Sequence, residues 1–148
     1  MIKNKLYDYC LNYVNERINS SQTAITVAQA AANEEGKSSA GDKYETGRAM
    51  MQLEIENNTS QLLQAKQLRQ VLEHINVAIT HSFVQQGALV ETSQGTYFIA
   101  IGAGLANIDS KPYYLISLAS PIGAILKDKK VGDNVIFNGK EISILAIN

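Results

Sequence analysis

Two long patterns of apolar and small residues with helical spacing constrain the fold of this chain more than any other feature. In the first half such residues recur at alternating steps of three and four: Leu11, Val14, Ile18, Ser21, Ile25, Ala28 and Ala32. A second, less regular set follows: Met51, Ile55, Leu62, Ala65, Leu68, Leu72 and Ile75. This spacing is typical of helices that bury a narrow stripe against a partner helix. We call these two sets the stripe residues, and they predict helices over residues 1–35 and from Asp42 to about residue 75.

Between the two patterns lies a short segment of small residues that includes Gly36 and Gly41. Glycine adopts backbone conformations that are closed to other residues, so such a segment suits a reversal of the chain. The simplest arrangement is an antiparallel helical hairpin with its tip near residues 36–45. With about 35 residues in each arm, the hairpin would be roughly 50 Å long.

From about His81 the apolar pattern changes to the alternation that is typical of β-strands. It predicts strands over residues 88–92 and 96–101, joined by a turn at Ser93-Gln94-Gly95, and a further strand over residues 113–117.

The last thirty or so residues carry two clear local signals. Ser120 followed by Pro121 predicts a short helix to residue 126, with Ser120 as its N-cap. Asn138-Gly139 is the preferred pair for a type I′ turn and predicts a final hairpin over residues 135–147. The fold class is therefore α+β, with a helical hairpin over residues 1–77 and a small sheet domain of four to six strands over residues 78–148.

Composition limits the classes of function without selecting one. The 148 residues carry a formal net charge of −1, which neither favours nor excludes nucleic acid, because duplex binding normally needs a basic face. The single cysteine, Cys10, has no partner for an internal disulfide, fits a reducing compartment and is interpreted as a small apolar core residue. The longest apolar run, over residues 118–126, is far shorter than the ~20 residues of a membrane span. We therefore expect a cytoplasmic protein that does not enter a membrane.

Asp42 and Glu45 stand at the predicted start of the second helix. An Asp-x-x-Glu pair there places both carboxylates on one side of the first turn, where they can share a metal ion or a water molecule. The same spacing is that of a capping box, which the positive end of the helix dipole favours, and the two interpretations are compatible. Because Mg²⁺ requires several further oxygen ligands, the pair would form half of a site that another macromolecule completes.

Three cations, Lys37, Lys43 and Arg48, flank this acidic pair. They either balance the neighbouring carboxylates or, in the functional interpretation, face RNA and steer the tip toward its phosphates.

Two other features are interpreted as structural. His74 and His81 have no acidic or cysteine companions nearby in the sequence, so they are placed at a domain boundary rather than in a metal site. Gly102-Ala103-Gly104 is similar to the start of a dinucleotide-binding motif, but Asn107 occupies the third glycine position and no helix can follow before Pro112. A nucleotide site is therefore not expected.

The C-terminal part of the chain contains two notable runs, Ser120-Pro121-Ile122-Gly123-Ala124-Ile125-Leu126 and Lys129-Lys130-Val131-Gly132-Asp133. Together they resemble the signature of the Gre transcript-cleavage factors of bacterial RNA polymerase. The segment Gly41-Asp42-Lys43-Tyr44-Glu45 is similar to the acidic tip of that family, and the hairpin after residue 135 matches its closing strands.

The resemblance implies a coiled-coil hairpin followed by an FKBP-like domain that docks on bacterial RNA polymerase through Ser120, Pro121 and Ile122. The coiled coil would enter the secondary channel and approach the nascent RNA. Asp42 and Glu45 would then be catalytic ligands for water and for a Mg²⁺ ion shared with the polymerase active site, which would promote two-metal cleavage of backtracked RNA. Such a factor is expected to be a monomer and an accessory to the polymerase, not an independent enzyme.

Other interpretations stay open at this point. The family usually continues Asn-Ala-Glu-Tyr after the tip, whereas this chain has Thr46-Gly47-Arg48-Ala49, so a regulator that occupies the channel without promoting cleavage is the alternative. A prolyl isomerase is disfavoured because the chain has no tryptophan and few aromatic residues to line a proline pocket: Tyr97, Phe98, Tyr113, Tyr114 and Phe137. A structural coiled-coil dimer is disfavoured by the two-glycine break.

Overall fold

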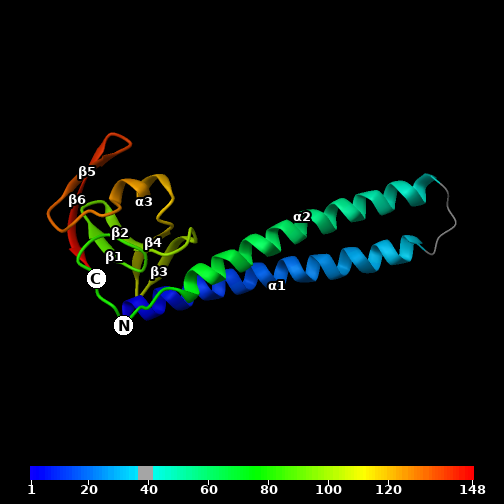
Figure 1. Ribbon diagram of the computed structural model, residues 1–148, viewed down its shortest axis with the longest axis horizontal. Coiled ribbons are helices and arrows are strands. Elements are labelled where there is room, and N and C mark those ends of the chain that lie inside the picture. The colour runs from blue at the N-terminus through cyan, green and yellow to red at the C-terminus, as the bar shows by residue number, and fades with distance from the viewer. Residues whose placement is uncertain (37–41) are drawn as a thin grey trace. The chain divides into compact units, whose positions relative to one another are not determined.

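The computed structural model describes the backbone of residues 1–36 and 42–148, and the side chains of residues 1–34 and 46–148 (Figure 1). Two long helices come first, α1 (Ile2–Gly36) and α2 (Asp42–Glu73), and a sheet with one short helix, α3 (Pro121–Leu126), follows. The predicted α+β fold is therefore confirmed. The chain packs into two compact units, Met1–Tyr13 with Gln70–Asn148, and Val14–Arg69. The domain boundary between residues 77 and 78 stays a prediction.

In the unit Val14–Arg69, α1 and α2 lie side by side and run in opposite directions (Figure 1). The stripe residues form the contact: Val14, Ile18, Ser21 and Ala28 of α1 and Ala65 of α2 are buried. The other stripe residues of α2 in this unit, Met51, Ile55, Leu62 and Leu68, are half-buried. We call this contact the helix stripe. Its most buried members are mostly small, so the helices share a narrow apolar surface.

Asn58 falls where the α2 pattern would place another stripe residue, and it interrupts the apolar surface. It is half-buried, and its side-chain amide donates to the carbonyl oxygen of Glu54 at 2.9 Å. The polar group is therefore satisfied by the helix that carries it.

The described residues form a six-stranded sheet in the order β3-β4-β2-β1-β6-β5. The strands are β1 (Leu89–Thr92), β2 (Gly95–Ile99), β3 (Gly104–Ile108), β4 (Lys111–Ile116), β5 (Asn134–Phe137) and β6 (Lys140–Ile147). Neighbours pair antiparallel except β2 and β4, which pair in parallel with Tyr97 opposite Tyr114. The sheet therefore brings together strands that are not consecutive in the sequence.

Two of the three hairpins agree with the sequence prediction. β1 and β2 pair with Thr92 opposite Gly95, which places the turn at Ser93-Gln94. Between β5 and β6, Asn138 and Gly139 have φ angles of 52° and 76°, as a type I′ turn requires.

The third hairpin was missed, because strand β3 was not predicted. Its sequence, Gly-Leu-Ala-Asn-Ile, is poor in the residues that favour strands. Its turn uses Asp109 and Ser110, both with positive φ, instead of a recognisable Asn-Gly pair. Pairing with β4 imposes the extended conformation on this segment.

The main core of the sheet lies beneath α3. Its buried members are Val84, Ala88, Val90, Ile99, Leu126, Val135, Ile142 and Ile144. Ile122 and Ile125 of α3 pack against this cluster, so the short helix is held by its apolar side.

The first turns of α1 belong to the same unit as the sheet and make polar contacts with the end of α2 and with the β3-β4 turn. The hydroxyl of Tyr7 donates to the carbonyl oxygen of Leu72 at 3.0 Å, and Lys5 Nζ forms an ion pair with Asp109 Oδ2 at 2.7 Å. Among the described helices, none is long and apolar enough to cross a membrane.

Candidate functional site

The acidic pair of the tip stands at the start of a helix, as predicted. α2 begins at Asp42, which places both Asp42 and Glu45 in its first turn. The side chains of Asp42, Lys43 and Glu45 lie outside the described residues, so their roles as metal, water and RNA ligands stay predictions. Arg48 is exposed, and its role in facing RNA is likewise a prediction.

The second predicted site, at the start of α3, is described in full. Ser120 is the N-cap: its hydroxyl accepts a hydrogen bond from the backbone N–H of Gly123 at 3.1 Å and donates to the carbonyl oxygen of Ser117 at 2.7 Å. The predicted cap is therefore confirmed, and this hydroxyl is already used inside the protein. Pro121 is exposed at the first helical position, and Ile122 is half-buried against the core. Of the three predicted docking residues, Pro121 presents the most surface to a partner.

Within α3, sequence reasoning missed the structural role of Gly123. It is buried, and a Cβ atom there would overlap the carbonyl oxygen of Ser117 and lie 2.9 Å from Ser120 Oγ. A glycine inside a short helix lowers helix propensity, so its presence was the available signal that the backbone packs closely there. Close packing around the cap therefore explains Gly123 without any partner.

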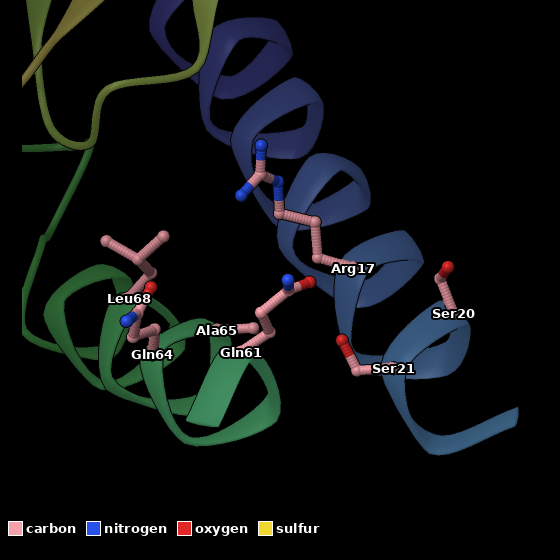
Figure 2. A pocket seen from close by; sticks show the side chains of 7 residues that line it. All are labelled: Arg17, Ser20, Ser21, Gln61, Gln64, Ala65 and Leu68. Atoms are coloured by element: carbon pink, nitrogen blue, oxygen red, sulfur yellow. The ribbon is translucent and has the colours of Figure 1, made fainter. Parts of the chain in front are cut away.

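A polar groove opens beside the helix stripe (Figure 2). It has a volume of about 460 Å³ and is lined by Arg17, Ser20, Ser21, Gln61, Gln64, Ala65 and Leu68. Figure 2 shows Ser21 turned toward α2 and Gln61 reaching toward α1. The small side chains of Ser21 and Ala65 leave this space in the stripe, and hydroxyl and amide groups border it. No carboxylate is among the lining residues, so the groove does not suit a divalent cation.

Cys10 has no exposed surface, and burial raises the pKa of its thiol to about 12. The thiol therefore stays protonated at neutral pH, which suits a core residue and not a nucleophile. Among the described side chains, no group of three or more His, Cys, Asp or Glu residues is placed to hold a metal ion.

The aromatic residues considered for a proline pocket serve packing instead. Phe98 is fully buried and Tyr113 is buried, while Tyr97 and Tyr114 stack with ring centroids 5.3 Å apart. Burial, with a smaller contribution from Tyr114, raises the pKa of Tyr97. Gly95 leaves room for the ring of Tyr114, which would lie 2.9 Å from a Cβ atom at that position.

Comparison with known proteins gives a distant structural likeness. No family model and no curated protein matches this chain. Among solved structures, it is similar to the one described as "Structure of the transcription factor Gfh1", with 18% sequence identity over 95% of this chain and 92% of that chain, and a TM-score of 0.35. A likeness at that TM-score carries no argument about activity.

Proposed function

We propose that this protein is a Gre-like transcription elongation factor that binds bacterial RNA polymerase and inserts its helix pair into the secondary channel. The observation that carries the proposal is one sequence resemblance over both halves of the chain: the acidic pair at the start of α2 and the Ser-Pro run at the start of α3. The arrangement of the described elements supports it. Two slender helices can enter a narrow channel, while the sheet domain offers a docking surface that includes Pro121.

The proposed chemistry places Asp42 and Glu45 beside the polymerase active site. Carboxylate oxygens are the ligands that Mg²⁺ prefers, so the donor set fits that ion, and the remaining ligands would come from the polymerase. When bound, the ion supplies charge stabilisation and a water molecule of lowered pKa for phosphodiester hydrolysis. The part of this chain is to carry two carboxylates on one turn of a helix and hold them against the cleavage site.

Transcript cleavage tests the proposal directly. Purified protein is added to backtracked elongation complexes, and the length of the RNA is followed by gel electrophoresis. We expect the wild type to shorten the RNA, and Asp42→Asn and Glu45→Gln to abolish the shortening while binding is kept. Glu54→Gln is the matched control, because Glu54 is an exposed carboxylate farther along the same helix.

A parallel binding assay separates docking from cleavage. Pro121→Asp alters the exposed start of α3, yet an acid in the first turn of a helix is tolerated, so we expect weaker polymerase binding without loss of folding. Wild-type protein that binds polymerase and leaves the RNA intact would favour the alternative, a channel-binding regulator without cleavage activity. The specific observation behind this alternative is the unusual Thr46-Gly47-Arg48-Ala49 segment after the acidic pair. Wild-type protein that fails to bind polymerase would contradict both.

A further inference from the structure

A second concave surface, unrelated to the tip or to α3, lies where the first turn of α1 meets the segment before β1. It has a volume of about 460 Å³, and its lining includes Ile2, Lys3, Val77, Ala78, Thr80 and Leu89. We call it the Lys3 trough. Its volume falls in the range of small-molecule sites, and most of these residues are apolar. Leu89 and Lys3 are its most buried members, each with 7% of its surface exposed.

The burial of Lys3 is unusual, because lysine is rarely buried without an acidic partner. Its Nζ donates a hydrogen bond to the carbonyl oxygen of Ile79 at 2.8 Å, and no carboxylate of the described residues forms an ion pair with it. The neighbouring Lys5, by contrast, is exposed and paired with Asp109. A neutral carbonyl satisfies one of the three N–H donors of Lys3 and supplies no compensating charge.

The pKa shifts of Lys3 and of its neighbour His81 agree with the burial of Lys3. Burial lowers the pKa of Lys3, and burial together with the charge of Lys3 lowers the pKa of His81. Both shifts disfavour the charged forms, because burial removes water from these groups and the charge of Lys3 repels a protonated His81. The turn at residues 76–79 holds the Ile79 carbonyl in place, since Asn76 Oδ1 accepts from the N–H of Ala78 at 3.0 Å. The ammonium group of Lys3 is therefore bonded to a carbonyl of a hydrogen-bonded turn.

We propose that the Lys3 trough binds a small amphipathic anion, with its carboxylate on Lys3 Nζ and its apolar body against Ile2, Val77 and Leu89. A carboxylate would complete a charge-assisted hydrogen bond, which is the strongest kind available to a buried ammonium. The apolar body would remove further surface of these side chains from water. This site is independent of the proposed role at RNA polymerase.

Hexanoate is a suitable probe, and hexanol and hexylamine carry the same tail with a neutral or a cationic head. We expect hexanoate to shift the NMR signals of the residues that line the trough. Hexanol and hexylamine are expected to bind at least about tenfold more weakly, because each lacks the anionic head. Equal affinities for hexanoate and hexanol would overturn the proposal, as would the absence of shifts at the trough residues with millimolar hexanoate.

Two variants of the full chain test the assignment of the head group. Lys3→Met keeps a long apolar side chain and removes the charge, so hexanoate affinity should fall by about tenfold or more. Lys5→Met is the matched control, and its hexanoate affinity should be unchanged because Lys5 is exposed and does not line the trough. Unchanged affinity in Lys3→Met would contradict the proposal.

If Lys3→Met does not fold, Ala78→Phe provides a second test. Ala78 is exposed and lines the trough, so a large side chain there should occupy its space without disturbing the core. Loss of the hexanoate shifts would support the proposal, and full retention of them would contradict it.

Discussion

The core of the sheet and the helix stripe use two different kinds of packing within one chain. In the unit that contains the sheet, large side chains such as Phe98, Ile99 and Leu115 are fully buried. In the helix stripe, three of the five buried residues are Ser21, Ala28 and Ala65. Burial stabilises in proportion to the apolar area removed from water, so each stripe residue contributes less than a core residue of the sheet. The helix pair should therefore open more readily than the sheet.

The polar groove illustrates the same difference. Beside Ser21 and Ala65 the two helices border an open groove of about 460 Å³, whereas the cluster beneath α3 is filled by side chains from several strands and from α3 itself. Small side chains in the helix stripe allow a narrow pair of helices, as the proposed entry into a channel requires, and the cost is weaker packing between the two helices. Four experiments test this difference in packing.

The largest change in the free energy of unfolding is expected for a substitution among the buried residues of the sheet. Phe98→Ala removes a fully buried ring and should lower the free energy of unfolding by about 3–5 kcal/mol. Leu68→Ala in the half-buried part of the helix stripe should cost clearly less, because part of its side chain already meets water. Urea denaturation followed by circular dichroism measures both, and similar losses for the two variants would refute the contrast.

The second largest loss of stability is expected for a substitution at the start of α3. Gly123→Ala forces a Cβ atom into the carbonyl of Ser117, and overpacking of this kind typically costs about 1–3 kcal/mol. Ala124→Ser, at the exposed neighbouring position, is the control and should change stability by less than about 0.5 kcal/mol. A Gly123→Ala protein as stable as the wild type would show that the backbone there adjusts at little cost.

A smaller effect, this time a gain of stability, is expected for a substitution in the helix stripe. Ala65→Leu adds apolar volume beside the polar groove, where space exists, and should stabilise the helix pair by roughly 1 kcal/mol. Hydrogen exchange of backbone amides in residues 14–34 and 46–69 would report it as slower exchange confined to that unit. Faster exchange would mean that the stripe is already tightly packed at Ala65.

The smallest expected effect is a dependence of the free energy of unfolding on pH. Because burial and Lys3 lower the pKa of His81 in the folded protein, the unfolded chain binds more protons near the ordinary histidine pKa of about 6.5. The free energy of unfolding should therefore rise as pH increases through that range, and fall as pH decreases.

Replacing one histidine at a time identifies the source of this dependence. His81→Asn should flatten the rise of stability with pH, while His74→Asn should leave the contribution of His81 in place. An unchanged slope in His81→Asn would assign the pH dependence to other groups.

The local signals of the sequence were sufficient for most of the secondary structure. The helical spacing of the stripe residues, the Ser120 cap and the Asn138-Gly139 turn each depend on neighbours in the chain, and the structure has all three. The same reasoning found the acidic pair at the start of α2 but could not test its role, because a metal or RNA ligand is defined by a partner.

Tertiary structure alone decided the features that join distant segments. Strand β3 forms because β4 pairs with it, the parallel contact of β2 with β4 skips the intervening strand β3, and Gly123 is confined by the backbone of Ser117. Lys3 was one charged residue among several in the sequence, and its burial arises where the first turn of α1 meets the Ile79 carbonyl. Spacing along the chain predicts which face of an element is apolar, whereas desolvation and close contact depend on what folding brings against that face.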